Sequence, residues 1–147
     1  MTETVTETLN TIEAYEPITV SAETLIQTIR EVADDDPERV YKAPDHMGRA
    51  PGGVNCYYVH TSADGWQAGC LIGKALNRLG VPLEVLRANE GKSAGLVINR
   101  LINLTGSFAE TQSANTFASV AQDCQDQGSP WREAVHTAEL NAGLALL

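Results

Sequence analysis

Apolar residues recur at helical spacing in five separate stretches of this chain, and no other feature constrains its fold as strongly. The stretches lie at residues 22–33, 72–79, 94–101, 117–124 and 131–138. Apolar side chains at positions i, i+3, i+4 and i+7 gather on one face of an α-helix, and that face must be buried against another element. We therefore expect a mainly α-helical protein whose helices, about five to six of them, form a compact bundle.

Capping residues mark where the expected helices begin and end. Ser21 and Ser93 are good N-caps, because a serine oxygen accepts from the free N–H groups of a first turn. Gly80 and Gly128 follow apolar stripes, where glycine readily adopts the left-handed conformation that ends a helix. Pro82 can open a further short helix, since the first turn does not use its missing N–H.

Residues 39–66 differ in character from the helical stretches. Residues 40–41 and 56–59 are rich in β-branched and aromatic side chains, as strands are. Pro and Gly recur in the ten residues 44–53 between them. We therefore predict a small antiparallel β-hairpin around residues 39–60 with a long connecting loop, followed by a turn at 62–65.

The net charge of −9 is concentrated at the front of the chain. Residues 1–38 hold ten acidic residues and one arginine, whereas residues 39–147 are neutral in sum. Residues 1–16 are also poor in large apolar groups, so we expect an acidic, flexible N-terminal segment at 1–18 before a single mostly helical domain at 19–147. The alternative for this segment is a weak helix, because Val5, Leu9 and Ile12 lie at helical spacing. Binding to nucleic acid through bulk charge is disfavoured, because that affinity comes from Lys and Arg.

The sequence lacks the common signals for a membrane span, for secretion and for the widespread enzyme classes. No apolar run approaches the roughly 20 residues that cross a bilayer, and the start of the chain has no apolar signal core. Three cysteines cannot close a disulfide framework by themselves, so we expect reduced thiols in a cytoplasm. There is no phosphate loop, dinucleotide fingerprint, H-E-x-x-H or G-x-S-x-G, and we predict no cofactor.

Three stretches together resemble a group of short hypothetical proteins from actinobacteria and their phages. They are Cys56-Tyr57-Tyr58-Val59-His60, residues 69–83 from Gly-Cys-Leu-Ile-Gly to Leu-Gly-Val-Pro-Leu, and residues 121–131 from Ala-Gln to Pro-Trp. The resemblance covers roughly residues 21–138 in order. It implies an actinobacterial or phage setting, but the group has no known activity, so it assigns no functional residue. By analogy, a small accessory phage protein is expected to bind a component of its host.

A cysteine nucleophile is one candidate for chemistry. Cys70 follows Gly69 at an expected helix N-terminus, where the helix dipole can lower the pKa of a thiol. His60 could act as its base, with Asp64 or Asn55 as the orienting third group. The alternative is that Cys70 simply packs in the core.

A zinc site built from Cys56, His60 and Cys70 is disfavoured by spacing. On a strand, Cys56 and His60 would lie about 13 Å apart, too far to share one ion. The chain has no C-x-x-C pair either, so we predict no metal site. The two cysteines are then expected to behave as small buried hydrophobes.

A binding surface is the third candidate, because residues 39–66 combine aromatic and basic side chains. The predicted contact residues are Arg39, Tyr41, Lys42, His46, Arg49, Tyr57, Tyr58 and Trp66. Arginine and aromatic residues dominate interface hot spots, and aromatic rings beside basic groups also hold single-stranded nucleic acid. On a strand, Tyr57 and Tyr58 would face opposite sides, one inward and one exposed. The alternative is that the aromatic rings fill the seam between hairpin and helices.

The sequence favours a non-catalytic binding protein, namely a phage or prophage accessory protein that engages a host protein in the host cytoplasm. The acidic front segment would then steer the partner or add a second contact. A small thiol-dependent enzyme using Cys70 and His60 is one alternative, and a nucleic-acid-binding accessory protein is another. We expect no membrane association. A homo-oligomer is also possible, because the apolar stripes can be buried within one chain or across a dimer interface.

Overall fold

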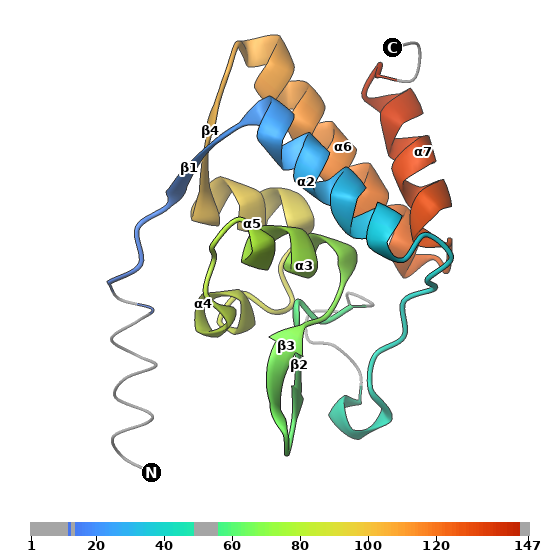
Figure 1. The fold of residues 1–147 in the computed structure, drawn as a ribbon. Helices are drawn as coiled ribbons and strands as arrows, with labels where there is room; N and C mark the ends of the chain where they lie inside the picture. The colour runs from blue at the N-terminus through green and yellow to red at the C-terminus, as the bar shows by residue number, and fades with distance from the viewer. Residues whose placement is uncertain (1–11, 13, 49–55, 145–147) are drawn as a thin grey trace.

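The computed structural model describes residues 12, 14–48 and 56–144. The chain is mainly helical, as the apolar stripes predict, and Figure 1 shows its helices stacked around a common interior. In the described ranges the α-helices are α2 (Ala22–Asp35), α3 (Leu71–Arg78), α4 (Leu83–Arg87), α5 (Ala94–Leu101), α6 (Phe108–Asp126) and α7 (Trp131–Asn141). None of these helices is both long enough and apolar enough to span a membrane.

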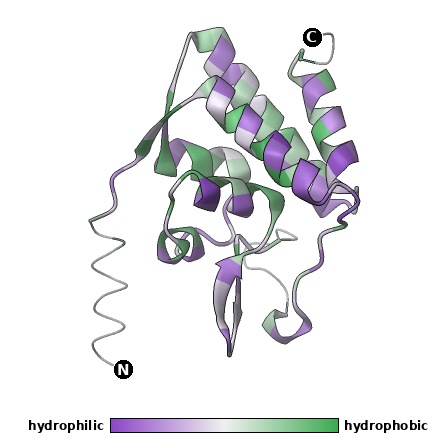
Figure 2. Ribbon diagram, viewed as in Figure 1, coloured by the Kyte–Doolittle hydropathy of each residue, from purple (hydrophilic) through white to green (hydrophobic). Residues whose placement is uncertain are grey.

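The core lies where α2, α6 and α7 pack together and where α3 packs against α2. Leu25 and Ile29 of α2, Phe117 of α6 and Trp131 of α7 are almost completely buried there. Each such side chain stabilises the fold by about 1.5–3 kcal/mol. Figure 2 shows apolar and polar residues alternating along these helices, as expected when one face of each helix is buried.

The predicted capping residues take their predicted roles. The hydroxyl of Ser21 accepts from Thr24 N at 3.0 Å, and that of Ser93 accepts from Leu96 N at 3.4 Å. Gly80 follows α3 with a φ of 113°, in the left-handed region expected of a C-cap glycine. Pro82 directly precedes α4 and is its N-cap.

A parallel pair of strands, which the sequence pattern did not indicate, joins two segments that lie far apart in the sequence. β1 (Ile18–Ser21) lies beside β4 (Ile102–Thr105), with Ile18 opposite Ile102. Each strand runs directly into a long helix, β1 into α2 and β4 into α6, so the parallel pairing sets the N-termini of both helices at one end of the bundle (Figure 1).

The part of the predicted N-terminal segment that the structure describes already contacts the domain. The hydroxyl of Tyr15 donates to Leu101 O at 2.5 Å, and β1 begins at Ile18. Residues 1–11 and 13 of that segment lie outside the described residues.

An antiparallel β-hairpin is present as predicted, but its strands lie further along the chain. β2 (Val59–Ser62) pairs with β3 (Gly65–Ala68) across the turn predicted at 62–65. The prediction that residues 40–41 form its first strand was wrong, and residues 39–44 contain no strand. A two-residue connection closes a hairpin at a much lower entropic cost than a ten-residue loop, so residues 59–62 pair with their near neighbour.

Candidate functional site

The β2–β3 hairpin projects from the helical body (Figure 1), and one of its residues is an exposed tryptophan. Trp66 on β3 is 41% exposed. The guanidinium of Arg87, on α4, lies 5.0 Å from the centre of its ring. This cation–π contact holds a large aromatic surface in one place while leaving much of it open to solvent.

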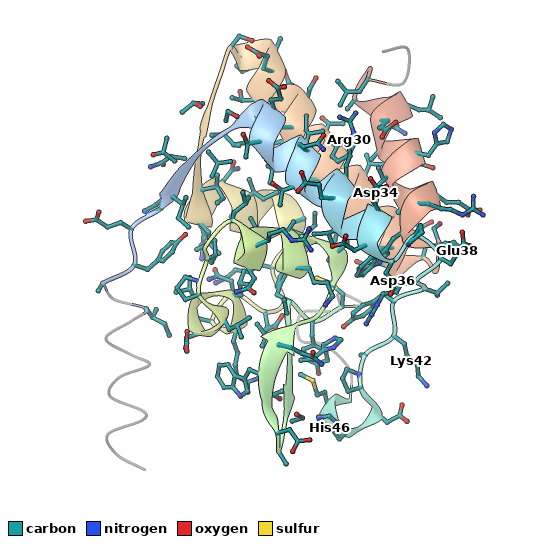
Figure 3. The ribbon with its side chains drawn as sticks, in the orientation of Figure 1. Arg30, Asp34, Asp36, Glu38, Lys42 and His46 are labelled. Atoms are coloured by element: carbon teal, nitrogen blue, oxygen red, sulfur yellow. The ribbon has the colours of Figure 1, made fainter. Side chains whose placement is uncertain are left out.

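The segment 44–47 runs along the other strand of the hairpin. A ring nitrogen of His46 lies 2.5 Å from Thr61 O, and Thr61 N donates to the Met47 sulfur at 3.4 Å. Figure 3 labels His46 on this segment and Lys42 just before it, and the Lys42 side chain points away from the body. Its ammonium lies 3.7 Å from a carboxylate oxygen of Asp45, and both groups are highly exposed, so this ion pair contributes little.

We define the hairpin surface by five residues that flank or form the projecting ribbon. They are Lys42, His46, Trp66, Gln67 and Arg87. All five are exposed. No pattern in the sequence links Arg87 to the hairpin. It reaches the hairpin because α4 packs against β2 and β3.

The two adjacent tyrosines are both buried, so neither supplies an exposed contact. Tyr57 is 7% exposed and Tyr58 is 1% exposed. Their hydroxyls donate to backbone carbonyls, Tyr57 to Met47 O at 2.7 Å and Tyr58 to Lys92 O at 2.6 Å. The segment lies before β2 instead of within a strand, and it is enclosed on both sides, so the alternation expected of a half-exposed strand does not apply.

Two of the other predicted contact residues also have structural roles. The Arg39 guanidinium lies 5.2 Å from the centre of the buried Trp131 ring, and Arg39 O accepts from Trp131 N at 2.9 Å. Tyr41 is half-buried, and its hydroxyl accepts from Tyr57 N at 2.9 Å. The candidate residues Arg49 and Asn55 lie outside the described residues.

His60 is buried and engaged by Tyr41. The Tyr41 hydroxyl lies 2.7 Å from His60 Nε2, and because it accepts from Tyr57 N, its own proton is free to be donated to that nitrogen. Burial lowers the pKa of His60, and the charges of Arg39 and Lys74 lower it further. Both effects favour the neutral imidazole over the charged form, and Tyr41 occupies one of its two ring nitrogens.

The carboxylate of Glu90 holds the base of the hairpin through backbone groups. Its two oxygens accept from Tyr58 N at 2.7 Å and from Val59 N at 3.1 Å. Burial raises the pKa of Glu90, while these two hydrogen bonds lower it in part.

Cys56 and Cys70 meet at the side chain of Gln122. Gln122 Nε2 lies 2.5 Å from the sulfur of Cys56 and 3.3 Å from that of Cys70. The Cys70 sulfur also accepts from Gly73 N at 3.4 Å and so caps α3. Hydrogen bonding to the Cys70 thiol, followed by burial, raises the pKa of Cys56 far above its usual range.

Two glutamines that sequence reasoning missed complete the start of α3. Gln125 Oε1 accepts from Leu71 N at 2.8 Å, and Gln122 Oε1 accepts from Ile72 N at 3.4 Å. Both glutamines are buried. Their signal was in the sequence, because they occupy positions of α6 that fall three apart in a stripe of buried apolar residues.

A pocket of about 180 Å³ reaches Cys56 from the surface. Its lining includes Ser93, Ser119, Gln122 and Asp126, and burial raises the pKa of Asp126. Cys70 does not line this pocket. Over residues 12, 14–48 and 56–144, no three His, Cys, Asp or Glu side chains lie together as a metal site would need.

Comparisons with protein-family models, with curated proteins and with solved structures each gave no match to the chain.

Proposed function

We propose that this chain is a non-catalytic binding protein that engages a protein partner through the hairpin surface. The observation that carries the proposal is Trp66, which is 41% exposed at a projecting hairpin and held there by Arg87. Tryptophan and arginine are the residue types most enriched among interface hot spots. A ring that is already held in place loses less conformational freedom on binding, which favours affinity.

The rest of the hairpin surface adds basic groups to an acidic protein. His46 lies beside β2 with Lys42 a few residues before it in the chain, and Arg87 lies beside Trp66 on β3, so a partner that encloses the hairpin can meet the cations Lys42 and Arg87. An acidic rim around an apolar groove is the complementary surface, and such charge complementarity speeds association and fixes orientation.

The positions of Cys70 and His60 support the binding proposal over a thiol enzyme. Cys70 is fully buried and its sulfur caps α3, while Tyr41 occupies His60 Nε2. A nucleophile needs both access to its substrate and a free base nearby.

The proposed setting is an actinobacterial cytoplasm, where the protein acts as a phage or prophage accessory protein on a host protein. This part of the proposal rests on the resemblance of residues 56–60, 69–83 and 121–131 to short proteins of actinobacteria and their phages.

The experiment is a capture of partners from an actinobacterial lysate with the tagged full-length chain, with and without nuclease. The Trp66→Ala variant is compared with Phe108→Ala, which removes the other exposed aromatic side chain in the described part of the chain. We expect one stoichiometric, nuclease-resistant partner that binds the wild type and the Phe108→Ala variant equally. Because a hot-spot side chain is lost, the dissociation constant of the Trp66→Ala variant should rise at least about 10-fold, measured by calorimetry with the purified partner.

Two results would count against the proposal. Undiminished affinity in a folded Trp66→Ala variant would remove the hairpin surface as the contact site. Recovery that disappears with nuclease would favour nucleic acid as the partner.

A further inference from the structure

We propose that Cys56 and Cys70 form a peroxide-sensitive pair that closes to a reversible disulfide. The first observation is their shared partner, because Gln122 Nε2 reaches both sulfurs, at 2.5 Å and 3.3 Å. Two sulfurs within hydrogen-bond reach of a single nitrogen are close neighbours. Nothing in this inference depends on the proposed binding function.

The backbone beside the two cysteines holds their segments together. Cys70 N donates to Tyr57 O at 3.0 Å, and Gly69 N donates to Tyr58 O at 2.8 Å. Cys56 is the residue next to Tyr57, so these bonds hold the two cysteines on adjacent backbone segments, as a disulfide requires. Gly73 lets α3 approach further, since a Cβ at that position would lie only 2.9 Å from Tyr58 Cα.

The pocket at Cys56 supplies the route for the oxidant and the order of events. Its volume of about 180 Å³ accommodates a small peroxide, because one water molecule occupies about 30 Å³ in the liquid. Ser93, Ser119 and Asp126 line it and offer hydrogen bonds to such a molecule. Cys70 is fully buried and does not line the pocket, whereas Cys56 does, so Cys56 meets the oxidant first.

The chemistry proceeds in two displacements. The Cys56 thiolate attacks one oxygen of hydrogen peroxide, an S–O bond forms, the O–O bond breaks, and the departing hydroxide takes up a proton as water. The sulfur of Cys70 then attacks the sulfur of the Cys56 sulfenic acid. The S–S bond forms, the S–O bond breaks, and the hydroxide leaves with the Cys70 proton as a second water. Two thiols are oxidised and one peroxide is reduced to two waters.

The disulfide would enclose the whole projecting hairpin. β2 and β3 span residues 59–68, and Cys56 and Cys70 stand just outside the two ends of that range. A bridge between them joins the segment before β2 to Cys70, the N-cap residue of α3. Loop closure on this scale, about 15 residues, should raise the Tm by roughly 5–10 °C.

The test treats the full chain carrying Cys124→Ser with hydrogen peroxide, because that substitution leaves only the pair. After quenching, remaining thiols are alkylated in denaturant and peptides are mapped by mass spectrometry. Trypsin alone leaves both cysteines in one peptide, and a second cleavage before Asp64 separates them. The wild-type chain is treated in parallel and read by intact mass, so the result does not depend on the variant folding.

We expect a peptide pair joined through Cys56 and Cys70, two hydrogens lighter than the free thiols and separated again by dithiothreitol. Because the pKa of Cys56 is raised, the reaction should accelerate from pH 7 to pH 9. The Cys70→Ser variant should instead accumulate a Cys56 sulfenic acid that dimedone traps. Full alkylation of both thiols after peroxide would overturn the inference, and so would irreversible oxidation of Cys56 while Cys70 stays free.

Discussion

Replacing Gly73 by alanine should destabilise the protein, whereas the same substitution at Gly95 should stabilise it. Both glycines lie inside helices, Gly73 in α3 and Gly95 in α5. Alanine is favoured over glycine in a helix by up to about 1 kcal/mol, and this gain is common to both substitutions.

The surroundings of the added methyl group decide the sign. A Cβ at position 73 would lie 2.9 Å from Tyr58 Cα and 3.0 Å from Tyr58 C, and closer still to Tyr58 O, all of them backbone atoms that cannot rotate away. The helix must move instead, and with it Leu71, Ile72 and Leu76, all of which are fully buried. Overpacking of this kind costs about 1–3 kcal/mol or more. Once the gain in helix propensity is subtracted, we expect the free energy of unfolding of Gly73→Ala to fall by about 1–2 kcal/mol.

At position 95 the nearest atom is Ser119 Oγ at 3.4 Å, which is an ordinary contact. The gain of about 0.5–1 kcal/mol is therefore retained. Urea unfolding followed by circular dichroism measures both values, with Tm changes of roughly 2–4 °C per kcal/mol as a second readout. A Gly73→Ala variant as stable as the wild type, or the same sign for both variants, would refute this account of how α3 contacts residue 58.

Two further predictions concern buried polar groups near the hairpin. Glu90→Ala leaves the N–H groups of Tyr58 and Val59 without their acceptor, so we expect the free energy of unfolding, measured in urea, to fall by about 2–4 kcal/mol. Glu90→Gln should be intermediate, because one acceptor oxygen remains. An alanine variant of wild-type stability would contradict this. His60 has a pKa lowered by burial, so the unfolded chain takes up its proton first, and stability should fall as the pH drops below about 6.5 towards the lower pKa of the folded state. The Tm difference between pH 7.5 and 5.5 should shrink in His60→Gln, and an unchanged difference would exclude His60 as its source.

The helical fold could be predicted from the sequence because its signals are local. The stripes, the N-caps Ser21 and Ser93, and the C-cap Gly80 depend on residues at most a few positions apart. The turn at 62–65 is equally local. The position of the first hairpin strand does not depend on local signals alone, since residues 40–41 carry the same β-forming side chains as a true strand. In the structure it is residues 59–62 that pair with residues 65–68.

The candidate sites depended on contacts between distant parts of the chain. Composition drew attention to the aromatic and basic side chains of residues 39–66, but it could not show that Tyr57 and Tyr58 are buried while Trp66 is exposed. Arg87 reached the hairpin only through the packing of α4. For the same reason, the meeting of Cys56, Cys70 and Gln122 could not be predicted.

The sequence by itself therefore determined which segments are helical, where they are capped and which faces are apolar, because backbone conformation responds to neighbours within a turn or two. The tertiary structure alone decided the parallel pairing of 18–21 with 102–105, the exposure of each aromatic ring and the meeting of the two thiols at Gln122. Those features depend on which buried surfaces meet, and apolar burial is non-directional, so the pattern of a single chain does not encode its partners.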